Sequence, residues 1–320
     1  MPQFDVTIAG ELNLDLILYG LPAELQPECE LLASDMMITL GGSSAIVAHN
    51  LALLGNRVGF ISRIGNDPMG QIALDRLAAS GTDVSRVLRS TDGTASGLSV
   101  ILARDTWRNI LTYPGTISTL SFDDLHFDYL ASARHFHLSS FYLQTALQSH
   151  VPELFRRLKA AGLTISMDTN DDPEDRWQGG IAEVLRYVDV FLPNEREALR
   201  ITGAEDLEAA ARRLAEIVPL VVIKRGAEGA TALRGTQCFK SSPVKVNAID
   251  AVGAGDSFDA GFISRYIQGA DVETCLSFGN LAGALSTTRP GGTEAFRDRE
   301  HRDQFLRENA PPASSSRIPR

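Results

Sequence analysis

Residues 250–262 read Asp250-Ala-Val-Gly-Ala-Gly-Asp-Ser-Phe-Asp-Ala-Gly-Phe262 and are the most informative part of the chain. Gly253 and Gly255 flank Ala254, and glycine allows backbone conformations that a Cβ atom would block. Asp256 and a run of small and apolar residues follow at once, which predicts a tight turn that opens into a buried helix. Backbone N–H groups at such a helix start converge on one point, and that point suits an anion.

Asp256 therefore stands where a carboxylate should be repelled. A negative group inside an anion site is either a metal ligand or a general base. A phosphoryl-transfer site explains the combination, because the amides hold the developing charge while Asp256 takes a proton from an acceptor hydroxyl. The alternative is a glycine turn capped by an aspartate, which favours helix N-termini through the helix dipole alone.

The same stretch resembles the second signature of the ribokinase-like (PfkB) sugar kinases, which runs Asp-Thr-x-Gly-Ala-Gly-Asp-x-Phe. The match covers Asp250, Gly253, Ala254, Gly255, Asp256 and Phe258, and Ala251 departs from the family's usual Thr. The resemblance implies that Asp256 is the catalytic base and that the glycine turn is the anion hole. It also implies a monovalent cation such as K⁺, bound by Asp250 and by carbonyl groups of the loop 289–293.

A glycine pair, Gly41 and Gly42, precedes a predicted helix. Residues 41–55 resemble the first PfkB signature, Gly-Gly-x-x-Ala-Asn-x-Ala-x-x-Leu-Ala-x-Leu-Gly, which implies that the glycine pair contacts hydroxyl groups of the acceptor. Ile46 stands where the family has a substrate-binding Asn, so that sugar contact is not carried over. Asn50 lies one helical turn further on and is the candidate to compensate. A plain strand-to-helix turn is the alternative.

Two polar residues share one face of a short strand at residues 10–16, Gly-Glu-Leu-Asn-Leu-Asp-Leu. They are Asn13 and Asp15. An aspartate can accept two hydroxyl groups at once, as sugar recognition requires, whereas solvated strand residues are the alternative. The resemblance implies that the residue matching Asp15 binds sugar hydroxyls, so Asp15 is the first candidate for acceptor binding and Asn13 the second.

Acidic and amide side chains at two further strand ends are candidates for the magnesium region. Asn194 and Glu197 lie in Leu192-Pro-Asn-Glu-Arg-Glu197, where ordinary capping of a helix is one interpretation. The segment resembles the family's Asn-x-x-Glu motif, which implies Mg²⁺ and its water shell nearby. Mg²⁺ favours one or two carboxylates plus phosphate oxygens over a full protein cage. Asp168 and Asn170 end another strand and are candidates to support the direct ligands from behind or to lie on the nucleotide side.

Two glycine-containing segments are candidates for the nucleotide side of the site. Val222-Ile-Lys-Arg-Gly-Ala-Glu-Gly229 resembles the family segment along the nucleotide phosphates and ribose, which implies roles for Lys224, Gly226 and Gly229. A solvated lysine is the alternative for Lys224. The small-residue helix and glycine loop that begin at Asn280 resemble the family region that packs on adenine, with Gly283 in the same run.

Apolar runs alternate with helical patterns along the chain, which predicts an α/β fold: a mostly parallel sheet with helices on both faces. The expected strands are Phe4–Ala9, Val58–Ile64, Ala133–Leu138, Leu163–Met167, Val188–Leu192 and Leu220–Ile223. The expected helices are Ala45–Leu54, Met69–Ala79, Val151–Ala161, Ile181–Arg186, Glu195–Ile201, Leu207–Ile217 and Asp256–Ile267.

Residues 12–40 and 95–113 break this alternation and predict a small β-sheet that forms a lid over the site. The second segment reads as a hairpin that turns at Arg104–Trp107. We expect one ribokinase-like kinase domain over residues 1–308, with a disordered Pro- and Ser-rich tail at residues 309–320. Exposed lid edges suggest a homodimer.

Bulk composition excludes several classes of protein. No apolar run approaches the ~20 residues that a membrane helix needs. A net charge of −10 argues against nucleic acid or an anionic membrane as the main partner. Three widely spaced cysteines indicate reduced thiols and a cytoplasmic protein. The P-loop pattern Gly-x-x-x-x-Gly-Lys-[Ser/Thr] and an early Gly-x-Gly-x-x-Gly are absent from the sequence, which disfavours P-loop nucleotidases and nicotinamide-binding folds.

The sequence therefore predicts an ATP- and Mg²⁺-dependent kinase that phosphorylates a primary hydroxyl of a sugar or related polyol. A nucleoside kinase of the same family is the first alternative, and Ile46 favours it. A non-catalytic sugar-binding or regulatory protein is the second, and the intact Asp256 speaks against it. Ser43 stands where members that act on phosphosugars often carry a lysine, which disfavours a phosphorylated acceptor.

Overall fold

A nine-stranded sheet forms the centre of the computed structural model, which describes residues 2–22, 24–104 and 107–309. The strand order is β13-β12-β11-β10-β9-β8-β1-β4-β5, and every pair from β11 to β5 is parallel. These strands are β1 (Val6–Ala9), β4 (Val58–Ile64), β5 (Asp83–Arg89), β8 (His135–Leu138), β9 (Thr164–Met167), β10 (Val190–Phe191), β11 (Leu220–Lys224), β12 (Ala230–Arg234) and β13 (Gln237–Ser241). The predicted α/β sheet is confirmed.

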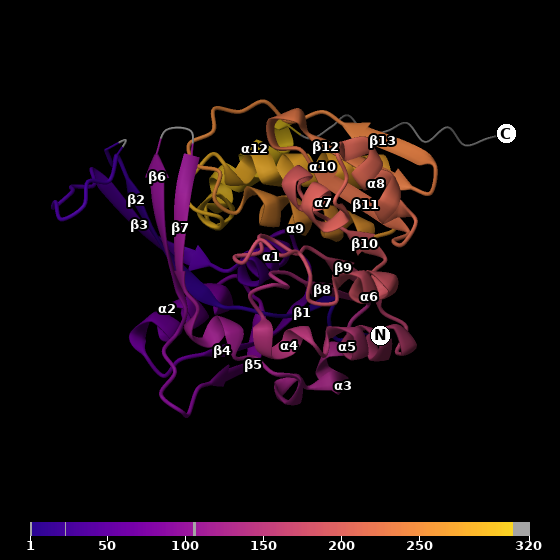
Figure 1. Cartoon of the computed structure of the whole chain (residues 1–320), viewed down its shortest axis with the longest axis horizontal. Coiled ribbons are helices and arrows are strands. Elements are labelled where there is room, and N and C mark those ends of the chain that lie inside the picture. The colour runs from indigo at the N-terminus through magenta and orange to yellow at the C-terminus, as the bar shows by residue number, and fades with distance from the viewer. Residues whose placement is uncertain (1, 23, 105–106, 310–320) are drawn as a thin grey trace.

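Helices cover both faces of this sheet (Figure 1). The α-helices are α1 (Ser43–Leu53), α2 (Pro68–Ala78), α3 (Phe127–Leu130), α4 (Thr145–Gln148), α5 (Val151–Ala160), α6 (Ile181–Val184), α7 (Glu195–Thr202), α8 (Leu207–Ala215), α9 (Ala254–Tyr266), α10 (Val272–Ser286), α11 (Glu294–Arg297) and α12 (Arg299–Asn309). Short 3₁₀ turns are Gly115–Ser118, Phe122–Asp124, Leu185–Tyr187 and Gly226–Glu228. Among the described helices, none is long and apolar enough to cross a membrane.

The side chains of each central strand alternate between two buried faces of the sheet. In β11, Val221 and Ile223 belong to the core under α5 and α8, whereas Leu220 and Val222 belong to the core under α9 and α10. Successive side chains of a strand point to opposite faces, so a strand that is covered on both sides reads as an unbroken apolar run. This is the reason that the sequence predicted the central strands correctly.

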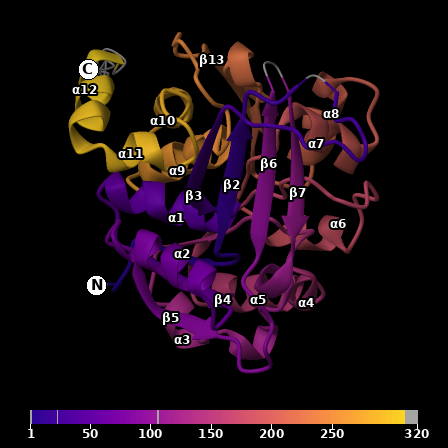
Figure 2. The ribbon, with the colours of Figure 1, turned by 90° about the vertical axis from the view of Figure 1, so that its left-hand side faces the viewer.

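Four more strands form a small separate sheet in the order β3-β2-β6-β7. They are β2 (Asn13–Tyr19), β3 (Asp35–Gly41), β6 (Leu98–Arg104) and β7 (Trp107–Tyr113). This sheet projects from one side of the main body and is seen face-on in Figure 2. The predicted small sheet is confirmed. Residues 105–106 of the expected turn and residues 310–320 of the expected tail lie outside the described residues, and Asn309 ends α12.

The two faces of the small sheet differ in character. Ile17 and Ile101 cluster with Val252 of the glycine turn, so their face is the inner one. A polar row crosses the inner face through the paired residues Thr39, Asp15, Ser99 and Thr112, and an apolar row beside it through Met37, Ile17, Ile101 and Ile110. The opposite, outer face carries Leu16, Leu18, Met36, Val100, Leu102 and Leu111.

The strands of the large sheet that the sequence did not predict are the exposed ones at its edges. β5 carries three charged residues and lies at one edge of the large sheet, where most of its residues are only partly buried. β12 and β13 form an antiparallel hairpin at the other edge, and the residues of β13 are partly or fully exposed. Edge strands have no need of an unbroken apolar sequence, so the pattern that identified the central strands is missing there.

Candidate active site

The glycine turn forms the start of α9. Gly253 is the N-cap with a φ of 70°, which lies in the left-handed region that glycine tolerates. A Cβ atom at Gly253 would lie 2.5 Å from the Cα atom of Gly292, so turn and loop pack backbone against backbone. The first turn of a helix leaves N–H groups without intrahelical partners, here including those of Gly255 and Asp256. The backbone arrangement that an anion site needs is present.

Asp256 lies in this first turn with 8% of its surface exposed. Burial, and then the negative charge of Asp168, raises the pKa of Asp256 to about 6. The side chain is thus ionised at pH 7 but more basic than an ordinary aspartate, which suits a general base. The side-chain amide of Asn170 donates to Asp256 Oδ1 over 3.4 Å.

A chain of hydrogen bonds continues from Asn170 to the start of α1. Ser140 donates its backbone N–H to Asn170 Oδ1 over 2.8 Å and its hydroxyl to Glu11 Oε1 over 2.7 Å. Glu11 is buried and accepts the backbone N–H and the hydroxyl of Ser44 over 3.0 and 2.7 Å. Sequence reasoning missed Glu11 and Ser140. Glu11 lay beside Asn13 in the quoted strand, but Ser140 depends on a φ of 53° that no sequence pattern reveals.

Lys224, at the end of β11, lies against the glycine turn. An added Cβ atom at Gly255 would lie 3.6 Å from Lys224 Nζ. This ammonium donates to Asp168 Oδ2 over 2.5 Å and to Asp259 Oδ2 over 3.2 Å. Burial alone would lower the pKa of Lys224, but the charges of Asp168 and Asp259 outweigh it and raise the pKa. A fixed positive charge therefore lies beside the predicted anion site.

The carboxyl groups around Lys224 exceed it in number. Burial alone would raise the pKa of Asp168, but Lys224 overrides burial and lowers it. Burial raises the pKa of Asp259 well above its usual value, and Asp259 Oδ1 lacks a hydrogen-bond partner within the described part of the chain. Burial, and then the charge of Asp168, raises the pKa of Glu197 to about 8. At pH 7 Asp259 and Glu197 are therefore mainly protonated, and a cation bound here would favour their ionised forms.

Asn194 and Glu197 form a capping box at the start of α7. Asn194 Oδ1 accepts from the backbone N–H of Glu197 over 2.9 Å, and Glu197 Oε2 accepts from that of Asn194 over 2.8 Å. The capping interpretation is therefore correct. The same residues also fit Mg²⁺. Glu197 is buried and lies close enough to Asp168 for that charge to raise its pKa. Asp259, in the same cluster, has a carboxyl oxygen without a hydrogen-bond partner among the described residues. Over residues 2–22, 24–104 and 107–309 no group of three or more acidic, His or Cys residues forms a full metal cage.

The acceptor-side candidates pack together where β2 meets β3. A Cβ atom at Gly41 would lie 2.0 Å from Asp15 Oδ1, and one at Gly42 would lie 2.7 Å from Asn13 Oδ1. Both polar side chains thus lie directly over the glycine pair. Asn13 Oδ1 is buried and has no hydrogen-bond partner among the described residues, which leaves an acceptor for a ligand hydroxyl. Burial, and then the charges of Asp256, Asp250 and Glu11, raises the pKa of Asp15 to about 7.

Ile46 packs on the catalytic turn from α1. Its Cδ1 atom would lie 3.3 Å from a Cβ atom at Gly253 and 2.9 Å from one at Gly292. Asn50, one turn further along α1, donates to Gly292 O and not to an acceptor pocket. Both side chains are buried. The structure therefore places both residues against the backbone of the turn and of the neighbouring loop at Gly292.

The nucleotide-side candidates have structural contacts of their own. A Cβ atom at Gly229, whose φ is 85°, would lie 2.1 Å from Ser241 O. Asn280 donates through Nδ2 to the carbonyls of Ser241 and Ser242 over 3.1 and 3.0 Å. A Cβ atom at Gly283 would lie 3.1 Å from Ala254 O, so Gly283 lets α10 approach the start of α9. Gly226 opens a 3₁₀ turn with a φ of 53°.

Asp250 joins the small sheet to the turn. Its Oδ2 atom accepts from the Tyr19 hydroxyl and from the Gly291 backbone N–H, both over 2.9 Å. Its Oδ1 atom accepts from the Val252 N–H over 2.9 Å. Tyr19 belongs to β2, so one carboxylate holds the small sheet, the start of the glycine turn and the loop 289–293 together.

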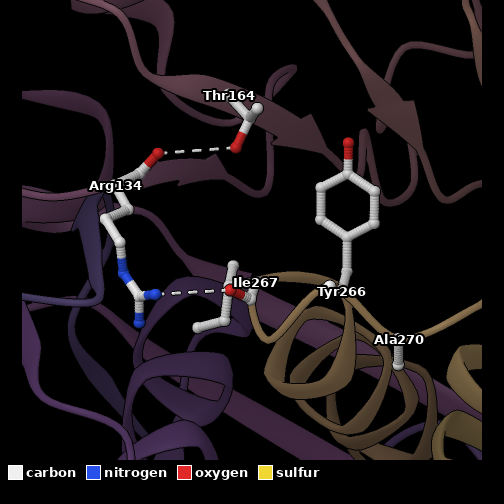
Figure 3. A pocket seen from close by; sticks show the side chains of 6 residues that line it. Arg134, Thr164, Tyr266, Ile267 and Ala270 are labelled. Carbon is white, nitrogen blue, oxygen red and sulfur yellow. Dashed lines mark hydrogen bonds between the residues drawn. The ribbon is translucent and has the colours of Figure 1, made fainter.

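Figure 3 shows a different pocket, of about 410 Å³, at the other end of α9. It is lined by Arg134, Thr164, Tyr266, Ile267, Gly269 and Ala270. Asp256 and Tyr266 are ten residues apart on one helix, which corresponds to roughly 15 Å. The pocket contains none of the predicted site residues and is not part of the site around Asp256.

The fold and the arrangement around Asp256 define a class of proteins, the ribokinase-like kinases that use ATP. The sequence model of the pfkB family carbohydrate kinases matches residues 3–299. The chain belongs to this family.

Three relatives illustrate the range within the family. The chain is 32% identical over 280 residues to a 2-dehydro-3-deoxygluconokinase from Bacillus subtilis, covering 83% of this chain and 86% of that protein. It is 29% identical over 283 residues to a cytidine kinase from Thermococcus kodakarensis, covering 87% and 94%. A putative ribokinase II from E. coli, solved with ATP and Mg²⁺, superposes with a TM-score of 0.82 at 26% identity, over 95% of this chain and 99% of that one.

Proposed function

We propose that this kinase transfers a phosphoryl group from ATP to a primary hydroxyl of a neutral sugar or related polyol, with Asp256 as the general base. The observation that carries the proposal is Asp256 itself, a buried carboxylate with a pKa of about 6 inside the first turn of a helix. A group that can accept a proton beside amides that can bind an anion is the combination that phosphoryl transfer requires.

In the proposed mechanism, Asp256 takes the proton of the acceptor hydroxyl as that oxygen attacks the phosphoryl group. The amides of Gly253, Ala254 and Gly255 hydrogen-bond to the phosphoryl oxygens, where charge is spread during transfer. Lys224 adds positive potential from beside Gly255. With the small sheet closed on the turn, these groups are held in place, so little reorganisation is needed during the chemical step.

The donor side of the proposal involves two groups of residues. Asn194 and Glu197 would lie next to Mg²⁺ and its water shell, and the ion would neutralise phosphate oxygens there. The nucleotide runs along the second group, Gly226, Gly229, Asn280 and Gly283. The E. coli neighbour was solved in complex with ATP and Mg²⁺, which supports this assignment for a chain of the same fold.

A neutral acceptor is favoured by the charges on the acceptor side. The pKa of Asp15 is raised to about 7 by burial and by the carboxylates of Asp256, Asp250 and Glu11. An acceptor that brings a phosphate or carboxylate there would add repulsion. Asp15 and Asn13 bind acceptor hydroxyls in this proposal, and the glycine pair permits the close approach.

A nucleoside acceptor is the second candidate, and the inner face of the lid favours it. The polar row at Asp15 suits the hydroxyls of a ribose. The apolar row beside it, with Ile17 and Ile101 at its centre, suits the flat face of a base. The cytidine kinase relative belongs to this functional class by name.

The lid sheet is also the proposed dimer interface. On its outer face, Met36 and Leu111 are 59% and 56% exposed, and Leu16, Leu18, Val100 and Leu102 lie between them. An apolar face of this kind on a projecting sheet marks a contact with another protein surface, and a second copy of the same face fits it. Light scattering of the purified protein should give twice the mass of one chain, and Leu111→Lys should shift it to one.

The resemblance predicts K⁺ at Asp250 as well. The residues present fit that ion poorly, because two of the groups that would bind it, the Asp250 carboxylate and Gly292 O, already accept hydrogen bonds from protein donors. The Asp250 carboxylate accepts three, and Gly292 O accepts from Asn50. No step of the proposed mechanism therefore depends on a monovalent cation.

The deciding experiment is an ADP-release assay over a panel of sugars, polyols, nucleosides, sugar acids and sugar phosphates. We expect turnover of neutral acceptors only, and we expect Asp256→Asn to release no ADP above background with any of them. Preferred turnover of a phosphorylated or acidic acceptor would contradict the charge argument. Binding of panel members without turnover of any would favour a sugar-binding protein instead.

A further inference from the structure

Helix α1 is bonded to the predicted anion hole through one buried side chain, Asn50. Its Nδ2 atom donates to Gly292 O over 3.1 Å and to Ser257 Oγ over 2.9 Å. Ser257 in turn donates its hydroxyl to Gly253 O over 2.8 Å. Asn50 and Ser257 have no exposed surface. The two glycines at the ends of these bonds are those that pack backbone against backbone.

The orientation of Asn50 is fixed from its other side by His49. Asn50 Oδ1 lies 2.8 Å from His49 Nδ1. Burial lowers the pKa of His49 to about 4, so the ring is neutral at pH 7. An amide oxygen can only accept, so Nδ1 carries the ring proton and donates it to Oδ1. Both ends of the Asn50 amide are therefore satisfied, and flipping it would break all three contacts.

The Asn50 contacts fall where the family resemblance places a monovalent cation. Such a cation would fix the turn by binding carbonyl oxygens of the loop 289–293. Here Gly292 O already accepts from Asn50, and the Asp250 carboxylate accepts from Tyr19 and from two backbone N–H groups. A cation bound to Gly292 O would have to share that buried oxygen with the Asn50 amide, which already donates to it.

We propose that Asn50 is a positioning residue for the anion hole, and that the chain His49–Asn50–Ser257 fixes the glycine turn in place of a monovalent cation. This inference rests on the proposed kinase function, because its main effect is on the rate of that reaction. Asn50 touches neither substrate. It acts through Gly253 and Gly292, whose placement decides whether the turn amides are preorganised for the phosphoryl group.

The chain provides a matched control two turns further along α9. Asn56 Nδ2 donates to Ser264 Oγ over 3.0 Å and to Leu51 O over 2.9 Å, which is the same kind of link between the end of α1 and α9. Ser264 is seven residues beyond Ser257, away from the turn. Asn56→Ala and Ser264→Ala therefore remove an equivalent bond without reaching the anion hole.

The first arm of the test compares these variants with Asn50→Ala and Ser257→Ala. We expect kcat to fall by about 10- to 100-fold in both site variants, since a displacement of about 1 Å can cost 100-fold. The KM values for ATP and acceptor should stay within about twofold, because neither residue touches a substrate. Asn56→Ala and Ser264→Ala should keep the wild-type kcat. If Asn50→Ala does not fold, Ser257→Ala decides alone. Equal kcat in site and control variants would overturn the proposal.

The second arm compares K⁺ with tetramethylammonium at equal ionic strength. We expect the wild-type protein to have the same kcat and the same melting temperature in both. A kcat that falls more than about tenfold without K⁺, or a melting temperature raised by K⁺, would overturn the proposal. The melting comparison needs no turnover. A protein that phosphorylates nothing on the panel would therefore refute the kinase function. The melting temperatures in K⁺ and in tetramethylammonium would still show whether the turn needs a cation.

Discussion

Asn170 supports Asp256 from a left-handed backbone position: its Nδ2 atom donates to Asp256 Oδ1 over 3.4 Å while its φ is 52°. Its own Oδ1 accepts the N–H of Ser140 at the end of the neighbouring strand. The left-handed region costs free energy for residues other than glycine and a few polar ones. Asparagine is one of these polar residues, so Asn170 can adopt the conformation and still supply the amide that orients the proposed base.

Two substitutions separate these effects at Asn170. Asn170→Gly and Asn170→Ala both remove the amide, so each should lower kcat by roughly tenfold as Asp256 becomes free to rotate. Only alanine is strained at a φ of 52°, so Asn170→Ala should also be less stable than Asn170→Gly by about 1 kcal/mol. Steady-state kinetics measure kcat, and urea unfolding measures the free energy of unfolding. Equal stabilities would mean that the backbone relaxes.

Asp256→Asn tests the base. The substitution keeps the size of the side chain and removes its ability to take a proton, so turnover should fall by about 10²- to 10⁴-fold. ATP affinity should be unchanged, because the amides and Lys224 remain; calorimetric titration with ATP and Mg²⁺ measures it. A variant that keeps more than a tenth of the wild-type rate would show that Asp256 is not the base.

The same substitution should have the opposite effect on stability. The pKa of Asp256 is raised from an unfolded value of 3.8 to about 6. The folded state therefore binds the proton more tightly, and stability is lost as the pH rises through the window from about 4 to about 6. Above this pH window, the ionised Asp256 side chain lowers the free energy of unfolding by at most about 3 kcal/mol, and asparagine avoids this loss. Asp256→Asn should thus melt higher than wild type at pH 8 but not at pH 4; no difference at pH 8 would contradict the raised pKa.

Activity should depend steeply on pH in the acidic range. Asp256 must be ionised to take a proton, and Asp15 must be ionised to accept two hydroxyls; their pKa values are about 6 and about 7. The kcat/KM for the acceptor, which reports on the free enzyme, should be full above pH 8 and fall with two ionisations as the pH drops through 7 and 6. In Asp15→Asn, only the lower ionisation should remain. A flat profile from pH 8 to pH 5 would exclude both assignments.

Lys224→Met should strongly destabilise the protein. It leaves the buried carboxyls of Asp168 and Asp259 facing each other without the ammonium that joins them. Loss of one partner from a buried ion pair costs about 3–5 kcal/mol. The double variant Lys224→Met/Asp259→Leu removes one of the stranded carboxyls and should recover part of the loss in urea unfolding. If the double variant is less stable than the single one, Asp259 contributes packing and not unpaired charge.

Most of the fold follows from sequence patterns that have a direct physical cause. Central strands are covered on both faces and so are continuous apolar runs, and the glycine turn needs a φ of 70° that favours Gly253. The position of Lys224 at the end of a strand could also be predicted from the sequence. Its two buried partners could not, because Asp168 and Asp259 meet Lys224 only when β9 lies two strands from β11 in the sheet and α9 packs on its face.

The contacts of Ile46 and Asn50 could not be predicted from sequence patterns. All of α1 from Ser44 to Leu51 is buried, so no polar face indicates which side of the helix meets the site. Motif spacing put Ile46 near the acceptor, whereas the structure packs it on Gly253 and Gly292. The partners of Asn50 lie more than 200 residues away in the chain, and only the folded arrangement of α1, α9 and the loop identifies them.

The hydrogen bond between Tyr19 and Asp250 has a mechanical consequence. Tyr19 belongs to the small sheet, and Asp250 begins the segment that ends in the proposed base. A small sheet that swings outward to admit an acceptor must stretch or break this bond, so the open enzyme holds its phosphoryl-binding turn less firmly. Water that enters through the open side would then meet an incompletely assembled catalytic turn, and ATP would be protected from futile hydrolysis until a true acceptor draws the sheet closed.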